Sequence, residues 1–223
     1  MESEDLLTKS KWSVLKELAK GEKAPVEIAK KTNQSIANVT HQLQILEAYN
    51  FVKKTKQEKE TKKKPGKPRT LYALNQEILA ISMLKTGLAD KKFLKLKEAD
   101  ECHKFILNLF FILNPEDHYY LIKFVCVTDM LKKADTIAYL KSSDKEIEIM
   151  IITEGFKEVR EQYSNMSIEG YDGKTKKIIS WSHNRKEVEE GLERKEDYFI
   201  NLVKNSNELI DKKDNIKELK QKI

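Results

Sequence analysis

Apolar residues recur at helical spacing through the first fifty positions, with short polar breaks between the stripes. The pattern predicts a first helix over residues 12–19 that stops at Gly21. A short second helix is expected over residues 25–32, because Pro25 suits the first turn of a helix. A third is expected over residues 35–49. The apolar positions of the three helices are Trp12, Leu15, Leu18, Ala19, Val26, Ile28, Ala29, Ile36, Val39, Leu43 and Leu46.

Two short β-type runs follow the third helix and flank a basic segment. Phe51-Val52 precedes the segment, residues 70–74 follow it, and Pro65-Gly66 resembles a turn near its end. Residues 53–69 hold eight Lys, one Arg and two Glu, a local net charge of +7, whereas the whole chain carries +6. The basic character therefore belongs to one predicted hairpin, which is suited to a polyanion. The competing interpretation is an ordinary solvated loop.

The polar face of the third helix is unusual for a chain in which 35% of residues are charged. Opposite the apolar stripe lie Asn38, His41 and Gln42, with Gln34 and Thr40 beside them, and the first two turns hold no Lys or Glu. Ser35 is placed to cap the helix N-terminus. Amide side chains can bond adenine N6 and N7 in the major groove, so this face is typical of a helix that reads bases.

Residues 32–52 resemble the recognition helix of winged helix-turn-helix regulators of the ArsR and MarR type. The matching positions are Val39-Thr40-His41-Gln42-Leu43, then Leu46, and finally Asn50-Phe51-Val52, where Asn50 stands in the usual glycine place. The resemblance covers residues 6 to about 74. It implies a three-helix core, the third helix in the major groove and the hairpin as a wing on the phosphates. The cysteines of the metal-sensing members are absent from residues 24–48.

Double-stranded DNA is therefore the expected partner, and the alternative use of such a domain is protein docking. The basic segment favours DNA, because lysines release counterions from the duplex. The expected contacts of the third helix are Gln34, Ser35, Asn38, Thr40, His41 and Gln42. Those of the wing are Lys53, Lys54, Lys56, Lys62, Lys63, Lys64, Lys67 and Arg69.

Residues 75–97 contain apolar positions that fit a helix, broken at Gly87. Such a helix either pairs across a two-fold axis or packs on its own domain. A strongly apolar helix is also expected over residues 102–113. Both are candidate seams for a homodimer, which would let two third helices read a near-palindromic site.

The second half predicts an α/β pattern. Strands are expected at residues 119–127, 146–153 and 178–181, with a less certain one at 132–140. Helices are expected at 156–164 and 185–205, the latter capped by Ser182. The predicted fold class is α+β: a winged helix-turn-helix domain at residues 1–90 and an α/β domain with a small mixed sheet at 91–223. An unknown effector ligand is a possible partner of the second domain.

Residues 119–211 show a weaker similarity to small nucleotidyltransferase-like domains. Glu146 and Glu148 fall where that superfamily carries two metal-binding aspartates, and they share one strand face. No glycine occurs between Gly87 and Gly155, so the expected turn that approaches a triphosphate is missing. We therefore expect a catalytically degenerate domain and no enzyme activity. The alternative function is a nucleotidyltransferase with a winged-helix targeting module.

Other chemistry is sparse. The cysteines Cys102 and Cys126 form no CxxC pair, and the histidines His103, His118 and His183 have no metal-ligand spacing. No P-loop, no membrane-length apolar run and no secretory signal is found, so we expect no metal, no cofactor, no membrane association and a cytoplasmic location.

Overall fold

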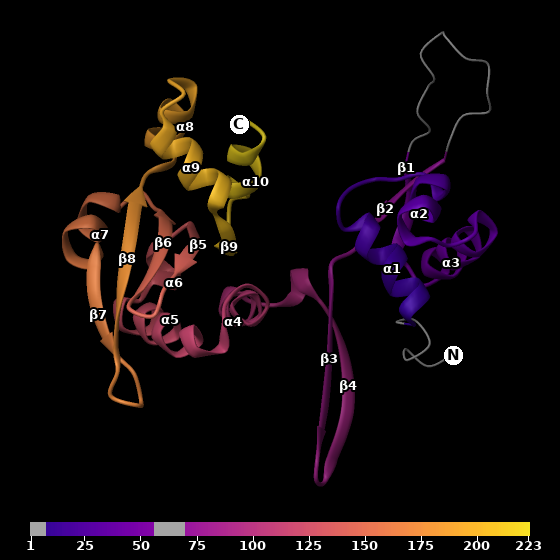
Figure 1. Cartoon of the computed structure of the whole chain (residues 1–223), viewed down its shortest axis with the longest axis horizontal. Helices are drawn as coiled ribbons and strands as arrows, with labels where there is room; N and C mark the ends of the chain where they lie inside the picture. The colour runs from indigo at the N-terminus through magenta and orange to yellow at the C-terminus, as the bar shows by residue number, and fades with distance from the viewer. Residues whose placement is uncertain (1–7, 56–69) are drawn as a thin grey trace. The chain divides into compact units, whose positions relative to one another are not determined.

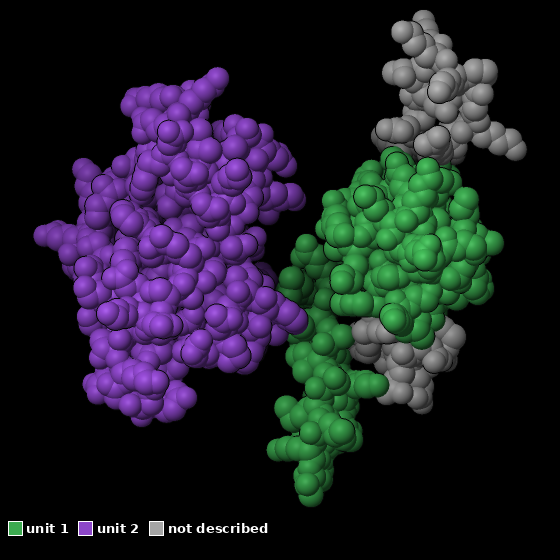
Figure 2. All heavy atoms as spheres, in the orientation of Figure 1, with its two compact units in different colours: residues 1–98 green, residues 99–223 purple. Residues whose placement is uncertain are grey.

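The computed structural model describes residues 8–55 and 70–223, and it divides into two compact units (Figure 2). Unit 1 runs from Met1–Glu98 and unit 2 from Ala99–Ile223. The boundary expected at residue 90 falls instead inside a strand. The predicted α+β class is confirmed, since helices accompany a mixed five-stranded sheet and small antiparallel sheets. No described helix combines the length and apolarity needed to cross a membrane.

Unit 1 contains the three helices and the two short strands that the sequence predicts (Figure 1). The strands are antiparallel, with Val52 opposite Leu74. Lys23, between the first two helices, forms an additional bridge to Tyr72, and each backbone N–H donates to the other residue's carbonyl at 3.0 Å. The elements are α1 (Lys9–Leu18), α2 (Pro25–Thr32), α3 (Ile36–Ala48), β1 (Val52–Thr55) and β2 (Leu71–Leu74).

The core of unit 1 follows the predicted apolar positions in part. Ile28, Val39, Leu43 and Leu46 are fully buried as expected, and so is Val14, which was not predicted. The predicted apolar positions Trp12, Ala19 and Val26 are exposed.

Asparagines form the turns after α2 and α3. Asn33 and Asn50 adopt the left-handed backbone conformation, with φ of 52° and 60°, which asparagine tolerates better than most residues. Asn50 therefore adopts the left-handed conformation that a glycine would also adopt at this position.

Residues 75–97 form no helix, and this prediction is wrong. They form the antiparallel hairpin of β3 (Ile78–Lys85) and β4 (Leu88–Lys95). The residues between the strands are Thr86 and Gly87, and Gly87 has φ of 82°, a conformation in which glycine has no steric cost. The predicted helix break is thus the hairpin turn. A 3-10 turn (Leu96–Glu98) follows.

Unit 2 is built on a mixed sheet in the order β7-β8-β6-β5-β9, in which only the β6–β8 pair is parallel (Figure 1). Its strands are β5 (Thr136–Ser142), β6 (Glu146–Ile152), β7 (Asn165–Glu169), β8 (Thr175–His183) and β9 (Asn207–Asp211). Its helices are α4 (Glu101–Ile112), α5 (Pro115–Thr128), α6 (Met130–Lys133), α7 (Phe156–Tyr163), α8 (Arg185–Glu193), α9 (Asp197–Asn205) and α10 (Asn215–Lys220).

Helices cover both faces of this sheet. Ile147, Ile149 and Ile151 of β6 belong to the core that includes residues of α4 and α5, while Met150 and Ile152 belong to the core with α8, α9 and α10. Since successive strand residues point to opposite faces, a strand covered on both sides must be apolar at every position. This explains why the predicted strand at residues 146–153, which is confirmed, ends in a continuous apolar run.

The strand predicted at residues 119–127 is wrong, because this segment lies in α5. Asn114 and Pro115 begin that helix as N-cap and first residue. Its buried side chains recur at positions 117, 120, 121, 124, 125 and 128, which is helical spacing. The run resembled a buried strand because apolar residues also occupy the outer face of the helix, where Tyr119, Ile122 and Val127 are exposed.

Smaller differences concern the ends of elements. The less certain strand at 132–140 begins only at Thr136, and β8 is longer than predicted. The single helix expected at 185–205 is two helices, separated by a turn in which Lys195 has φ of 55°. Its cap is Asn184, whose side-chain oxygen accepts from the Glu187 N–H at 2.7 Å, whereas Ser182 lies within β8. Strands β7 and β9 were not predicted.

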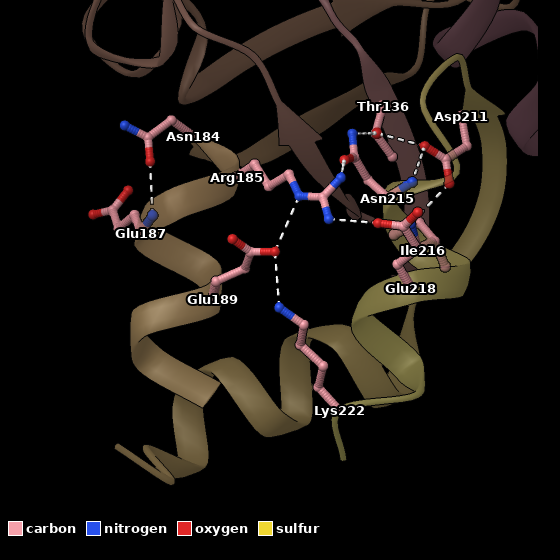
Figure 3. Close-up of polar contacts among 10 residues, drawn as sticks. All are labelled: Thr136, Asn184, Arg185, Glu187, Glu189, Asp211, Asn215, Ile216, Glu218 and Lys222. Atoms are coloured by element: carbon pink, nitrogen blue, oxygen red, sulfur yellow. Dashed lines mark hydrogen bonds and ion pairs between the residues drawn. The ribbon is translucent and has the colours of Figure 1, made fainter. Parts of the chain in front are cut away.

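A buried polar network joins the C-terminal helix α10 to the sheet (Figure 3). The Asp211 carboxylate accepts from the Thr136 hydroxyl at 2.8 Å and from the N–H groups of Asn215 and Ile216 at 2.9 and 2.8 Å. The Asn215 amide donates to the Thr136 oxygen at 2.9 Å, and Arg185 donates to the Asn215 side-chain oxygen at 3.0 Å. Asp211 thereby satisfies two free N–H groups at the start of α10 and the buried Thr136 hydroxyl together.

Replacing Asp211 by alanine should lower the free energy of unfolding by about 2–3 kcal/mol, because Thr136 and Asn215 would keep buried polar atoms without this partner. Urea unfolding of the whole chain measures the change. Asp214→Asn is the matched control, since Asp214 is exposed, caps α10 with no side-chain hydrogen bond and already has a left-handed backbone. Equal stabilities of the two variants would contradict the role of Asp211.

Candidate nucleic-acid interface

One flank of α3 carries a row of side-chain hydrogen bonds that ties it to α1. The Gln34 amide donates to the Ser13 hydroxyl at 2.7 Å, and the Gln34 oxygen accepts from the Ser10 hydroxyl at 2.8 Å. Asn38 donates to the same Gln34 oxygen at 2.7 Å, and Gln42 donates to the Asn38 oxygen at 3.2 Å. These residues form the amide row: Ser10, Ser13, Gln34, Asn38 and Gln42.

This geometry changes the role expected for three predicted DNA contacts. Gln34, Asn38 and Gln42 are half-buried, and each uses its amide within the domain. The remaining Gln42 side-chain oxygen is buried and accepts no hydrogen bond from the described residues. These amides therefore fix the orientation of α3 against α1 before any ligand arrives.

A different set of α3 residues faces outward. His41 and Gln44 are exposed and Thr40 is half-exposed, although its hydroxyl donates to the Ile36 carbonyl at 2.8 Å. Ser35 is exposed, and its hydroxyl caps the helix by accepting from the Asn38 N–H at 3.2 Å. Ile36 was predicted to be buried but is 51% exposed.

Gln44 was not among the contacts predicted from the sequence. Gln44 follows His41 by three residues, which places both on one helix face. Ala37 and Ala48 extend that face, which holds no Lys, Arg, Asp or Glu. The one acid of α3, Glu47, is half-buried and pairs with Lys54. Small residues leave room for the backbone of α3 to approach a partner closely.

Only two of the predicted wing residues lie within the described part of the chain. Lys53 is exposed on β1. The Lys54 ammonium lies 2.8 Å from a Glu47 carboxylate oxygen and 5.9 Å from the centre of the Tyr72 ring. The hydrogen bond to Glu47 raises the pKa of Lys54 above its usual value. Lys54 is thus already paired, whereas Lys56, Lys62, Lys63, Lys64, Lys67 and Arg69 lie outside the described residues.

The two glutamates of β6 do not form a metal site with other described residues. Glu148 is engaged by the Trp181 indole N–H at 3.1 Å and by the Lys141 ammonium at 3.1 Å. Across residues 8–55 and 70–223, no group of three or more His, Cys, Asp or Glu residues is arranged to hold a metal ion. Glu148, one of the two glutamates at the predicted metal-binding positions, is therefore already paired with a lysine and a tryptophan of the same unit.

An open groove in unit 2 lies beside this carboxylate, with a volume of about 740 Å³. Trp181 and Tyr198 are each about 40% exposed, and their ring centroids are 6.1 Å apart. Lys204 is exposed and forms no ion pair with a described residue. The groove is lined by Leu140, Lys141, Glu148, Trp181, Tyr198, Asn201, Leu202, Lys204, Asn205 and Asn207.

A buried histidine holds the hydroxyl of Tyr198. His183 is 6% exposed, with Nδ1 2.9 Å from a Glu187 oxygen and Nε2 2.9 Å from the Tyr198 hydroxyl. Since a carboxylate only accepts, Nδ1–H donates to Glu187 and Nε2 accepts from the tyrosine. Burial lowers the pKa of His183, against the opposing effect of Glu187, and burial raises the pKa of Tyr198. The spacing of His183 and Glu187 by four residues was the overlooked signal.

Comparison with known proteins leaves the chain unassigned: no protein-family model matches it, and neither does any curated protein.

The neutral state of His183 predicts a pH dependence of stability. Its pKa lies below the ordinary 6.5 in the fold, so the unfolded chain gains this proton first as pH falls. The free energy of unfolding should therefore decrease as pH falls below 6.5, and His183→Gln should reduce this decrease. Urea unfolding at several pH values compares the two chains. Parallel pH profiles would show that His183 contributes nothing to it.

Proposed function

We propose that the chain is a sequence-specific DNA-binding transcriptional regulator, in which α3 enters the major groove and the β1–β2 hairpin contacts phosphates. The observation that carries the proposal is the exposed, uncharged face of α3, formed by Thr40, His41 and Gln44 with small residues around them. In a chain with 35% charged residues, an ordinary solvated helix face would carry lysine or glutamate. Hydrogen-bonding groups without charge suit base edges.

Two further features support this assignment. Three helices followed by an antiparallel hairpin, with a bridge from Lys23 to Tyr72, match the element order expected for a winged helix. The amide row holds α3 on α1, so the reading face is oriented in advance and binding needs less ordering. Lys53 and the basic residues that follow it along the chain supply the sequence-independent attraction to phosphate.

The two competing functions have less support. A docking module would not need the local charge of +7 that the hairpin segment carries. A nucleotidyltransferase would need carboxylates free to bind a divalent cation, and Glu148 is paired with Lys141 and Trp181. We therefore retain DNA binding as the function and propose that unit 2 has no transfer activity.

The small size of the DNA-contacting surface indicates that two copies of the chain bind DNA together. A single helix in the major groove contacts about four or five base pairs, which specifies too little sequence for a genome. We propose that the regulator binds a near-palindromic site as a homodimer.

Unit 2 would then sense an effector in its open groove. The exposed rings of Trp181 and Tyr198 can stack on a planar ligand, and Lys204 can pair with an anionic group on it. Asn201 and Asn205 supply amides along the same helix. The ligand class that fits these groups is a small planar molecule with a negative charge.

Neutralising the wing should weaken affinity without changing sequence choice. In the Lys62→Ala, Lys63→Ala, Lys64→Ala triple variant, binding to all duplexes should fall similarly and the salt dependence should flatten by up to about three phosphate contacts. Binding titrations at several salt concentrations give the slope. An unchanged slope would remove the wing from the interface.

Changes on the exposed face of α3 should instead alter sequence choice. His41→Ala or Gln44→Ala should cost roughly 1–3 kcal/mol on the preferred site and much less on random duplexes. Asn38→Ala is the matched comparison, because Asn38 lies on the same helix but faces α1. We expect Asn38→Ala to lower the thermal stability of the chain more than it changes the preference for one DNA sequence over another. Identical losses on preferred and random duplexes for His41→Ala and Gln44→Ala would refute base reading by this face.

Ligand entry into the groove should change the fluorescence of Trp181. In a Trp12→Phe background Trp181 is the remaining tryptophan, so adenosine monophosphate or a benzoate-type anion can be titrated directly. Saturable quenching that weakens in Lys204→Ala is expected for at least one of these probes. Quenching that is linear in probe concentration would indicate only collisions with an exposed ring.

A further inference from the structure

The β3–β4 hairpin leaves apolar side chains on both of its strands in contact with solvent. Every described side chain from residue 80 to residue 95 is exposed, including Ile81 at 41%, Met83 at 51% and Leu84 at 88%. A two-stranded hairpin is marginally stable in water, and further strands or a packed helix are needed to stabilise it. The hairpin therefore needs a partner.

Its two outer edges differ in charge. Strand β4 has four charged residues among eight, of which Lys91 and Lys92 are adjacent, and lysines on an edge oppose strand addition. Strand β3 is uncharged over residues 78–84. An apolar edge that is exposed from residue 80 onward is a template for another strand, so pairing should occur along β3.

We propose that two copies of the chain pair antiparallel along β3, with Ile81 of each copy on the two-fold axis, and so form a four-stranded sheet. Charge complementarity fixes this partner and register. Glu77 lies four residues before Ile81 and Lys85 four residues after it, so each Glu77 stands opposite Lys85 of the other copy. Both side chains are exposed, and neither forms an ion pair with a described residue of its own chain.

The register also matches apolar with apolar positions. In this register Met83 stands opposite Leu79 of the second copy, and Leu84 stands opposite Ile78. Within each chain Leu79 is buried and Ile78 half-buried, so the exposed residues of the seam are those from residue 80 onward. Since alternate residues of an edge strand direct their N–H and C=O groups away from the sheet, neighbouring registers differ by two residues. A shift by two in either direction moves a charged residue opposite an apolar one or removes both ion pairs. Opposite charges that face each other across strands stabilise pairing, whereas like charges oppose it.

The pairing does not depend on DNA binding, and it is measured without DNA. Sedimentation of the full chain should show a reversible dimer at micromolar concentration. Glu77→Lys and Lys85→Glu should each raise the dimer dissociation constant roughly tenfold. The two variants change the net charge in opposite directions, so a general charge effect would not weaken both.

Mixing the two variants provides the sharpest result. A heterodimer of a Glu77→Lys chain with a Lys85→Glu chain has opposite charges at both ends, so an equimolar mixture should recover the native dissociation constant. The double variant Glu77→Lys, Lys85→Glu should recover it alone. Lys92→Glu, on the charged strand β4, is the control and should change the constant less than about twofold.

A monomeric native chain, single variants with native association, or a mixture that stays as weak as its components would each overturn the proposal. A Lys92→Glu chain as weak as the single variants would do the same, because the effect would then not be specific to β3. If the dimer forms as proposed while DNA is not bound, the pairing stands and the regulatory function does not.

Discussion

The amide row between α1 and α3 is the contact on which the candidate interface depends. Its hydrogen bonds use every side-chain amide on the inner flank of α3, through Gln34, Asn38 and Gln42. Two consequences follow. The helix has one orientation on its domain, and the groups left to meet a ligand are the exposed His41 and Gln44 and the half-exposed Thr40. Polar residues here divide between a structural and a reading role according to the flank on which they lie.

The two units differ in how the apolar surfaces of their strands are covered. In unit 2, helices cover both faces of the sheet, and a polar network around Asp211 fastens the last helix to it (Figure 3). In unit 1, the β3–β4 hairpin has no such cover among the described residues from residue 80 to residue 95, and the apolar side chains there remain in solvent. The hydrophobic effect therefore favours association at β3. The proposed DNA recognition, by contrast, needs two copies because one helix contacts too few base pairs to specify a site, and not because a single copy would be unstable.

The sequence predicted the parts of the fold in which local signals agree. In unit 1, helix caps, a proline at a helix start and the apolar stripe all indicate the same three helices. Strand β6 was also clear, because alternation and β-branched residues coincide. The prediction failed where one run of residues fits two periods. Residues 119–127 are rich in aromatic and β-branched side chains but form α5, since Asn114-Pro115 starts a helix and the buried positions recur at helical spacing.

The candidate site was predicted in residue type and only partly in geometry. The sequence showed that the first two turns of α3 hold no Lys or Glu. The hydrogen bond that links Gln34 to Ser13, however, joins side chains 21 residues apart and cannot be predicted from spacing. The same limit hid the contact of His183 with Tyr198, 15 residues away. Contacts between residues so far apart depend on how the helices and strands pack, and the local pattern of a single sequence does not show this.

Selection from a pool of random-sequence duplexes tests the central claim most directly. The full chain is incubated with the pool at physiological salt, and the bound duplexes are amplified and sequenced over several rounds. We predict enrichment of one near-palindromic motif whose half-sites lie about one helical turn apart. A bound pool with the same sequence distribution as the input would contradict sequence-specific recognition by α3.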